Sequence, residues 1–526
     1  MGSHIERERK FDAADGGAAL PDLHGLPGVG AVRAASAEEL DAVYYDTQDH
    51  LLRSRRITLR RRTGGHDEGW HLKLPAGPDS RREIQLPLSG EGPDEPVPAE
   101  LALRVRARAH GAALVPVARL HTLRRRSLLL DAADRPLAEI AEDAVTAHRL
   151  PPGPSGGKGG GGERRWSEVE AELSPGAPEE RGTGLLDAIE ERFAGVGLHR
   201  SSSASKLERA LGGTRVAPPT AAPPAPAPAS GSIGALLADR LREQVETVLV
   251  LDGAVRRDRP DSVHRMRAAV RGLRTTLRAF RPYLDRAAGT ELDLELGRLG
   301  RVLGEARDSE VLGSRLGEQL AALPAVERPG PMAQRIGDWC TDRYRRAHRL
   351  ALAELDSPRY FALVEALDRL AAAPGLTGRA RRPVAPELRR VLAREQRRVA
   401  RRIAAARTLP SGPERDEGLH VARKAAKGAR YAGETAEPAA GKPARRFARR
   451  MKAVQTLLGD RQDALVAREL IPIIATWAET AGEPGFGYGV LYAAEAAVLA
   501  RTDAELPAVC AAALDPGLVR WGAAGS

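Results

Sequence analysis

The chain has 526 residues, with 81 lysines and arginines against 70 aspartates and glutamates, so its formal net charge is +11. This length is sufficient for two to four domains with sizeable cores. With 42% hydrophobic and 29% charged residues, it is too apolar for a wholly disordered chain and too charged for a membrane protein. No stretch approaches the roughly 18 consecutive apolar residues that a bilayer span needs. The sequence pI near 10.0 favours an anionic partner: nucleic acid, anionic lipid or polyphosphate.

The cellular setting is predicted from the cysteines and the N-terminal residues. Cys340 and Cys510 cannot by themselves make a disulfide framework or a zinc site. Residues 1–10 carry charges with no apolar segment after them, so no secretory signal is expected. We therefore expect a reduced, cytoplasmic setting. Aromatic residues make up only 4% of the chain, which argues against single-stranded nucleic acid held by base stacking.

A Pro/Ala-rich segment divides the chain. Residues 216–232 read VAPPTAAPPAPAPASGS, a composition that forms an extended spacer rather than a packed core. We predict a first domain over residues 1–212, a linker over 213–232 and a second domain over 233–526. The Gly/Pro-rich residues 151–162 are short, and we interpret them as a loop within the first domain.

The first domain shows mainly the period-two alternation of β-strands. The alternating segments are 5–11, 57–62, 71–74, 83–88 and 168–173. Residues 36–43 and 184–195 are predicted to be short helices, the first with Ser36 as N-cap and Glu39 as its capping-box partner. This domain is therefore expected to be β-rich with a few helices.

The second domain changes to the 3.6-residue period of amphipathic helices. The predicted helices cover 236–251, 263–284, 292–303, 310–323, 332–355, 360–372, 385–406, 419–434, 445–458 and 464–480. The pattern also repeats: residues around His264 match those around His420, and the LGxxxD element at Leu303 matches that at Leu458. We therefore predict an all-α domain of two similar helical bundles, about 233–380 and 381–526.

Charged residues share one face of several predicted strands. Residues two apart in a strand point to the same side, which groups Glu6, Glu8 and Lys10 in one strand, Arg60 and Arg62 in a second, and Glu168, Glu170 and Glu172 in a third. A solvated outer face would give the same alternation. If the strands instead close into a barrel with these faces inward, the side chains line a polar tunnel. Carboxylates there could hold a hard cation, and arginines and lysines could bind phosphate.

At these residues the chain resembles the CYTH family of triphosphate tunnel metalloenzymes. Glu6-x-Glu8-x-Lys10 is similar to the family's ExExK signature, and Tyr45-Asp46-Thr47, Leu59-Arg60-x-Arg62, Trp70-His-Leu-Lys73, Arg82-Glu83, Glu168-Val-Glu170 and Lys206 follow in the family's order. The resemblance covers residues 1 to about 212 and implies an antiparallel β-barrel tunnel that binds a linear triphosphate and requires Mg²⁺ or Mn²⁺.

The resemblance also implies a role for each tunnel residue. The expected phosphate ligands are Lys10, Arg60, Arg62, Lys73, Arg124, Arg126 and Lys206. The residues expected to hold metal or to position water are Glu6, Glu8, Asp143, Glu168 and Glu170, and the expected catalytic set is Glu6, Glu8, Lys10, Glu168 and Glu170. Arg60–Arg62 and Arg124–Arg126 are runs of three arginines, so alternation alone leaves open which members face the tunnel. No Walker-type GxxxxGK[ST] run is present, which excludes a P-loop.

Two basic stripes stand out in the second domain. His264, Arg267, Arg271 and Arg274 are spaced to share one helix face, and the matching stripe is His420, Arg423, Lys427 and Arg430. Like charges one turn apart repel, so a stripe without interleaved acids costs stability unless an anion neutralises it. A solvated charged face remains the alternative interpretation. The duplicated histidines and LGxxxD elements resemble the CHAD family, over about 233–526. This resemblance implies two four-helix bundles with a basic groove that binds inorganic polyphosphate.

The sequence therefore predicts a multidomain α+β protein, in which a metal-dependent triphosphatase barrel precedes an all-α, duplicated polyphosphate-binding domain. Three alternatives remain open. The barrel could be inactive and the whole protein a polyphosphate-binding, granule-associated factor. It could be an adenylate cyclase or a thiamine triphosphatase, because a fold does not determine a reaction. The basic helices could bind nucleic acid, but scarce aromatics and the absence of a familiar motif argue against this.

Overall fold

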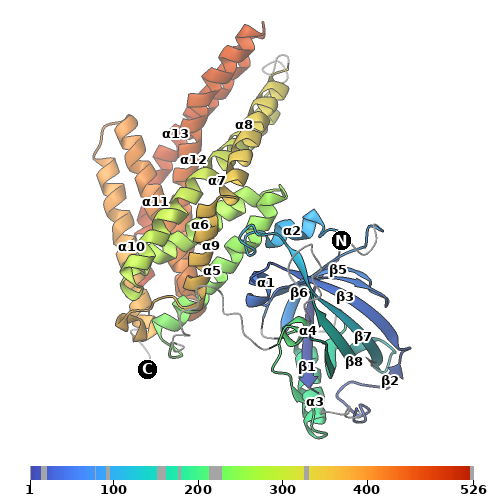
Figure 1. Cartoon of the computed structure of the whole chain (residues 1–526). Helices are drawn as coiled ribbons and strands as arrows, with labels where there is room; N and C mark the ends of the chain where they lie inside the picture. The colour runs from blue at the N-terminus through green and yellow to red at the C-terminus, as the bar shows by residue number, and fades with distance from the viewer. Residues whose placement is uncertain are drawn as a thin grey trace. The chain divides into compact units, whose positions relative to one another are not determined.

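The structure of the chain is a computed structural model. It describes residues 2–12, 20–77, 79–90, 95–150, 162–175, 179–212, 228–324 and 331–521. The chain forms two compact units, Met1–Thr220 and Ala221–Ser526, the first rich in strands and the second helical (Figure 1). Residues 151–161 of the predicted loop and residues 216–227 of the spacer lie outside the described residues.

The first unit is a closed antiparallel barrel of eight strands. These are β1 (Gly2–Asp12), β3 (Glu38–Asp46), β4 (Thr58–Thr63), β5 (Gly69–Pro75), β6 (Ser80–Leu86), β7 (Val115–Leu130), β8 (Pro136–Arg149) and β9 (Arg164–Leu173). The strands follow the order β1-β6-β5-β4-β3-β7-β8-β9, and β9 pairs back with β1 to close the barrel. Two short strands lie off this circuit: β2 (Ala31–Ala34) pairs with β7, and β10 (His199–Arg200) pairs with β1.

Helices cover the apolar outer side of the barrel. Phe11 and Val169, from neighbouring strands, pack against Phe193 of α3 (Glu179–Ala194). On another part of the wall, Leu59 and Trp70 pack with residues of α2 (Ala99–Val105). Because alternate residues of a strand point to opposite sides, covering the apolar faces outside turns the charged faces inward. The charged alternation seen in the sequence therefore belongs to the barrel interior and not to a solvated outer face.

Two short helices complete the unit. α1 (Leu51–Ser54) follows β3, and the Asp46 carboxylate accepts hydrogen bonds from the backbone N–H groups of Thr47, Leu52 and Arg53. α4 (Lys206–Ala210) begins at Ser205, whose side chain accepts from the Glu208 N–H as an N-cap. α4 thereby places Lys206 against the barrel interior.

The helix predicted over residues 36–43 is wrong. This segment belongs mostly to strand β3, in which Leu40, Ala42 and Tyr44 are buried at every second position. β3 pairs with β4 on one side and β7 on the other. Two flanking strands satisfy its backbone groups, and this tertiary pairing overrides the local capping-box pattern. The helix predicted over 184–195 is confirmed as the larger part of α3.

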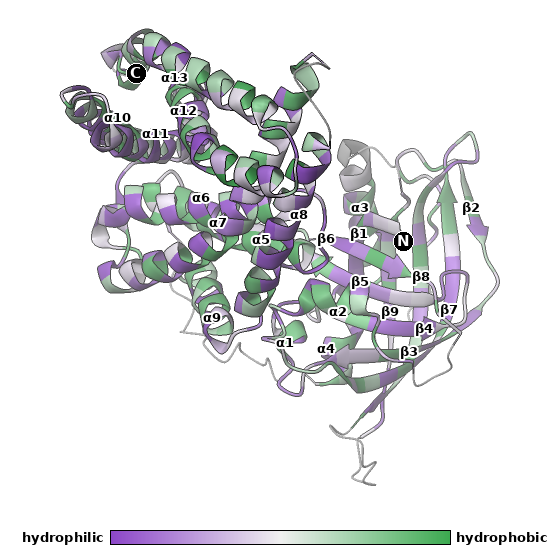
Figure 2. Cartoon of the chain, turned by 90° about the horizontal axis from the view of Figure 1, so that it is seen from above, coloured by the Kyte–Doolittle hydropathy of each residue, from purple (hydrophilic) through white to green (hydrophobic). Residues whose placement is uncertain are grey.

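The second unit is entirely helical apart from isolated bridges and loops among its described residues. Its α-helices are α5 (Ile233–Arg256), α6 (Ser262–Ala279), α7 (Arg286–Ala322), α8 (Met332–Leu355), α9 (Pro358–Ala372), α10 (Val384–Arg407), α11 (Pro413–Ala440), α12 (Lys442–Thr480) and α13 (Phe486–Ala513). Hydrophilic and hydrophobic residues alternate along most of them, as amphipathic packing requires (Figure 2).

The LGxxxD elements lie inside long helices. The sequence predicted a break near each of them, but residues 292–322 belong to the single helix α7 and residues 445–480 to the single helix α12. The helix α13 was not foreseen. None of the helices in the described ranges has the length and apolarity to cross a membrane.

The basic stripes lie on corresponding helices of the second unit. His264 and its stripe are on α6, the helix before α7, and His420 and its stripe are on α11, the helix before α12. The cores beneath them are apolar: Met266, Val270 and Leu273 on α6, and Ala422 and Ala429 on α11, are all buried. Burying these apolar stripes leaves the cationic faces on the other side of each helix.

Candidate functional site

The barrel encloses a polar cavity of about 270 Å³. Most of the residues that the sequence singled out line it: Glu6, Glu8, Lys10, Arg60, Arg62, Lys73, Arg124, Glu170 and Lys206. They come from five different strands and from α4, so the cavity exists only when the barrel is closed. Antiparallel register brings them together, because directly paired residues project to the same side. Lys10 is paired with Glu170, for example, and Asp143 with both Arg124 and Glu168.

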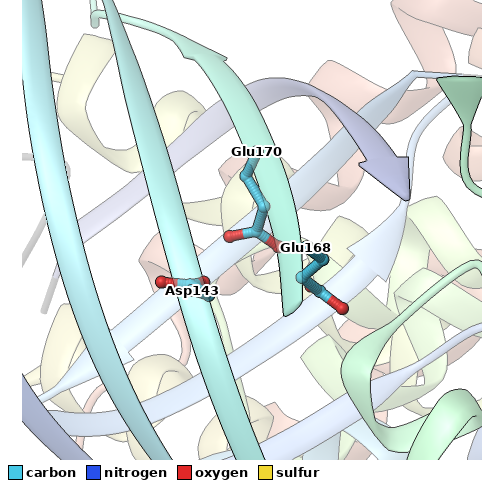
Figure 3. Close-up of side chains that lie close together, drawn as sticks. All are labelled: Asp143, Glu168 and Glu170. Carbon is cyan, nitrogen blue, oxygen red and sulfur yellow. The ribbon is translucent and has the colours of Figure 1, made fainter. Parts of the chain in front are cut away.

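Three carboxylates form a buried cluster beside the cavity. Asp143 of β8 and Glu168 and Glu170 of β9 each offer an oxygen, and these oxygens lie within 4.8 Å of one another (Figure 3). The Lys206 ammonium lies 2.9 Å from Asp143, 2.8 Å from Glu168 and 2.6 Å from Glu170. It therefore occupies the centre of the cluster as the counter-ion of all three groups.

Arg124 also pairs with this cluster. Its guanidinium donates to both Asp143 oxygens, at 2.8 and 2.6 Å, and to a Glu170 oxygen at 2.8 Å. Burial raises the pKa of Asp143, but Lys206 and Arg124 outweigh it and hold that pKa below its ordinary value. The pKa of Glu170 is also held below its ordinary value, because Lys10, Lys206 and Arg124 outweigh the effect of burial. The carboxyl groups of Asp143 and Glu170 are therefore anionic at neutral pH.

The N-terminal strand supplies a second acidic group. The Lys73 ammonium donates to Glu6 at 2.5 Å, and Lys10 pairs with Glu8 at 3.4 Å and also contacts Glu170. Burial raises the pKa of Glu8, but Lys10 and Lys73 bring it down to about 2. The buried Oε2 of Glu6 has no hydrogen-bond partner in the described part of the chain, so this oxygen is free to accept one.

The structure decides which member of each arginine run faces the cavity. Arg60 and Arg62 line it, whereas Arg61 faces the other side of β4 and pairs with Glu95. Arg124 lines it too, but Arg126 does not belong to the cavity lining. Its guanidinium pairs instead with Glu38 and Glu139, at 2.6 and 3.1 Å. The expected phosphate ligand Arg126 is thus occupied by two carboxylates, of which Glu139 itself lines the cavity.

Several cavity residues were not assigned by sequence reasoning. Tyr44 lies beside Arg60, whose guanidinium donates to its hydroxyl at 3.3 Å. Glu172 lines the cavity, and burial, with the Glu6 carboxylate next, raises its pKa to about 8. Its position two residues after Glu170 in the same alternation was a signal for the shared face. Tyr44 gave no such signal, because it directly follows the segment 36–43 that was predicted to be a helix.

The donor set of the cluster fits Mg²⁺ or Mn²⁺. These hard cations prefer oxygen ligands, and carboxylates are the usual anionic ones. Asp143, Glu168 and Glu170 supply three carboxylates from two adjacent strands. On β1, Lys10 is the residue paired with Glu170; Glu8 lies one pair farther along, opposite Glu172, and is engaged by Lys10, and Glu6 lies two residues beyond Glu8. The residues that would hold the cation are thus Asp143, Glu168 and Glu170.

Replacing Lys206 by methionine is expected to raise Mn²⁺ affinity about tenfold, because a cation no longer has to displace an ammonium that makes three ion pairs. The measurement is a titration of free Mn²⁺ by electron paramagnetic resonance on the full chain at pH 8. A Lys206→Met variant that is folded and binds Mn²⁺ no better than the wild type would contradict this prediction.

The two basic stripes of the helical unit come together in space. The pKa of Lys427 on α11 is affected by Arg271 and Arg267 of α6, and that of Arg271 by Arg423 of α11. A cavity of about 670 Å³ adjoins the stripes, with His264 of α6 and Arg430 of α11 in its lining. The stripe residues therefore form one cationic surface between α6 and α11.

Part of this charge is neutralised, contrary to the expectation from the sequence. Arg267 pairs with Asp308 of α7 at 3.1 Å. Asp293 of α7 accepts from Arg274 at 2.9 Å and from Arg278 at 2.7 Å. The acidic partners come from a neighbouring helix, which spacing along α6 cannot show. In the described part of the chain Arg271 and Lys427 form no ion pair, and after burial the largest charge effect on the pKa of each comes from a neighbouring arginine.

The LGxxxD glycines make room for the stripes. A Cβ on Gly304 would lie 3.4 Å from the Arg267 guanidinium, and one on Gly459 would lie 3.4 Å from that of Arg423. Arg267 and Arg423 hold corresponding places in the two stripes. Asp308, four residues after Gly304, then pairs with Arg267. In both halves, the glycine of the LGxxxD element thus allows an arginine of the stripe to pack against the long helix that contains the glycine.

Polyanion binding to the helical unit is expected to take up a proton near neutral pH. Burial, and then Arg271, Arg423, Arg430 and Arg267, lower the pKa of Lys427 to about 6, so in the free protein this amine is largely neutral at pH 7.5. A bound polyanion favours the charged form. Affinity should therefore fall as pH rises above 6.

Calorimetry with long-chain polyphosphate in two buffers of different ionisation enthalpy measures this uptake. The Lys427→Arg variant, which stays charged across the range, should bind with less proton uptake and a flatter pH profile. Equal uptake in the two proteins would contradict this assignment.

Comparison with known proteins agrees with both halves of this architecture. Residues 4–207 match the CYTH domain family, and residues 239–472 match the CHAD domain family. The chain is therefore a CYTH–CHAD protein, as its sequence predicted. It belongs to one family with two proteins of Mycobacterium tuberculosis, Uncharacterized protein MT2285 (strain CDC 1551 / Oshkosh) and Uncharacterized protein Rv2226 (strain ATCC 25618 / H37Rv). Each is 39% identical over 511 residues, which are 96% of this chain and 95% of theirs.

Solved structures resemble each half separately. The CHAD domain from the plant Ricinus communis is 26% identical and covers 56% of this chain and 96% of its own, with a TM-score of 0.44. A putative adenylyl cyclase from Hippeastrum, described as having a dominant triphosphatase activity, is 15% identical. It covers 40% of this chain and 95% of its own, with a TM-score of 0.23.

Proposed function

We propose that the barrel is a metal-dependent hydrolase of inorganic triphosphate or related triphosphate and polyphosphate chains, and that the helical unit binds inorganic polyphosphate. The observation that carries the proposal is the closed barrel interior, where a cluster of three carboxylates lies beside the phosphate-binding candidates Lys10, Lys206 and Arg124. A site for phosphate alone would not need buried carboxylates, and a site for a cation alone would not need so many lysines and arginines.

The cationic residues would bind and orient the phosphate chain. Arg60, Arg62 and Arg124 lie around the cavity with Lys10 and Lys73, so an extended chain of phosphates would meet a donor from several sides. Closed walls hold these donors in place before substrate enters, which lowers the cost of organising them around the developing charge.

The carboxylates would have two separate tasks. Asp143, Glu168 and Glu170 would hold Mg²⁺ or Mn²⁺, which when bound would neutralise negative charge on phosphate oxygens. Glu6 has a buried oxygen without a partner in the described ranges, and this oxygen would accept a hydrogen bond from a water molecule and orient it. Glu8 would fix Lys10 at the same end of the strand.

The helical unit would collect the substrate. The cationic surface of α6 and α11 would bind long phosphate chains, and a tether between the two units would raise the local concentration of chain ends near the barrel. This proposal includes a cytoplasmic location in association with polyphosphate.

Release of phosphate from four substrates tests the proposal: inorganic triphosphate, ATP, thiamine triphosphate and long-chain polyphosphate, each with Mg²⁺ and with Mn²⁺. We expect triphosphate or polyphosphate to be hydrolysed fastest, and chelation to stop the reaction. Cyclic AMP with pyrophosphate from ATP would instead identify a cyclase. No release from any substrate, with polyphosphate binding retained, would identify a non-catalytic binder.

A further inference from the structure

The turn between β4 and β5 is attached to the wall of the barrel cavity. It covers residues 64–68, and His66 and Asp67 belong to the cavity lining. The backbone carbonyl of Asp67 accepts from Arg62 at 3.1 Å, from the His71 ring at 2.9 Å and from Gln85 at 3.2 Å. Three side chains from three strands thus converge on one carbonyl and hold the turn at the cavity.

The position of the turn also brings the carboxylate of Asp67 into contact with Arg62. The Asp67 carboxylate forms an ion pair with the Arg62 guanidinium, which is only 3% exposed. Arg62 is one of the residues that we assign to phosphate, and Arg60 and Arg124 lie close enough to affect its pKa. A carboxylate on this guanidinium holds the place that a phosphoryl oxygen would take, because both groups accept the same N–H donors.

The Arg62 guanidinium has an N–H donor that Asp67 does not use. The buried Nε of Arg62 has no partner among the described residues, while its Nη2 serves both Asp67 oxygen atoms, carbonyl and carboxylate. A phosphoryl group has three oxygens and more charge than a carboxylate, so it could engage the guanidinium more completely. Gly64 and Gly65 in the turn and Gly69 directly after it have positive φ values of 79, 76 and 150°, and a Cβ on them would lie within 2.6 Å of Glu39, Leu40 and Leu86, respectively, so the path of the turn requires glycine at these positions.

We propose that Asp67 is an internal competitor of the substrate for Arg62, so that phosphate chains bind by displacing its carboxylate and opening the β4–β5 turn. This inference rests on the proposed function and adds a specificity-determining residue to it. Asp67 weakens the binding of every chain that reaches Arg62, and it selects for chains with enough charge to displace it. The residue does not touch the carboxylate cluster, so its effect is on phosphate affinity and not on cation affinity.

The test is Asp67→Asn, with Glu68→Gln as the matched control. Both changes remove one negative charge from the same turn, but Glu68 is exposed and is not the residue that pairs with Arg62. Hydrogen–deuterium exchange on the full chain, titrated with inorganic tripolyphosphate in EDTA, follows the barrel separately from the helical unit and without turnover. In the wild type, tripolyphosphate should slow exchange in β4 and speed it in residues 64–68.

The tripolyphosphate concentration that gives half-maximal protection of β4 should be about tenfold lower in Asp67→Asn than in the wild type, because the ion pair of Asp67 with Arg62 no longer competes with the ligand. Its turn should exchange fast even without tripolyphosphate, and Glu68→Gln should behave as the wild type does. Protection of β4 with equal midpoints in Asp67→Asn and Glu68→Gln would overturn the role of Asp67 while keeping the barrel as the phosphate site. Absence of protection in every barrel strand of the wild type would overturn the proposed function itself, and this inference with it.

Discussion

Replacing Asp143 by asparagine is expected to lower metal-dependent hydrolysis at least about 100-fold. Asp143 belongs to the carboxylate cluster and also holds Arg124 through both of its oxygens. Removing its charge weakens cation binding and loosens an arginine that faces the phosphate, and a change in the shell around a metal ligand alone costs about 10- to 100-fold. Turnover of the best substrate at saturating Mg²⁺ and at saturating Mn²⁺ measures the effect.

Glu142→Gln is the matched control. Glu142 directly precedes Asp143 on β8 and therefore points to the outer side of the barrel. It should keep wild-type turnover, although both variants lose one negative charge from the same strand. Because Asp143 is buried between cations, its replacement also costs stability, so folding is checked by circular dichroism. A folded Asp143→Asn variant with wild-type turnover would rule out the cluster as the cation site.

Reversing Arg271 and Lys427 to glutamate together is expected to weaken polyphosphate binding by the helical unit at least about 100-fold. Burial and neighbouring arginines lower the pKa of both residues, and a bound anion would offset this repulsion. Each lost charge-assisted hydrogen bond costs about 1.5–3 kcal/mol, and the new carboxylates add repulsion. Binding of long-chain polyphosphate to the full chain at two salt concentrations measures both the affinity and the number of counterions released.

Arg349→Glu with Lys442→Glu provides the control, since both residues are exposed, lie outside the stripes and change the net charge by the same amount. This control should lose affinity only slightly, through the overall charge. The Arg271/Lys427 variant should also show a shallower dependence of affinity on salt. If both double variants lost the same affinity, the stripes would act only as a diffuse positive field and not as a binding surface.

Much of the barrel site could be predicted from the sequence because its signal is local. Strand alternation places Glu6, Glu8 and Lys10 on one face whatever the rest of the chain does. Helical spacing does the same for His264, Arg267 and Arg271. The resemblance to two families then related these faces to one another, and the structure places most of the resulting residues around one cavity.

Other features depend on partners far away in the chain. The strand β3 could not be predicted from its own residues, because its pairing with β4 and β7 outweighs the helical signal at its start. Both LGxxxD elements looked like helix breaks, since the sequence does not show that Gly304 packs beneath Arg267 and Gly459 beneath Arg423. In each case a contact between distant segments, and not a local propensity, decides the outcome.

By itself the sequence determined the class of the two halves, the acidic and basic faces and the stripes, because these follow from residue spacing on a strand or a helix. Only the tertiary structure decided which arginine of each run enters the cavity, how Lys206 becomes the counter-ion of three carboxylates and how Asp67 comes to lie on Arg62. It also decided that Lys427 faces arginines while Arg267 and Arg274 have acidic partners. The physical reason is the same throughout: the charge state and availability of a buried side chain are set by its neighbours in space, which barrel closure and helix packing bring from distant parts of the chain.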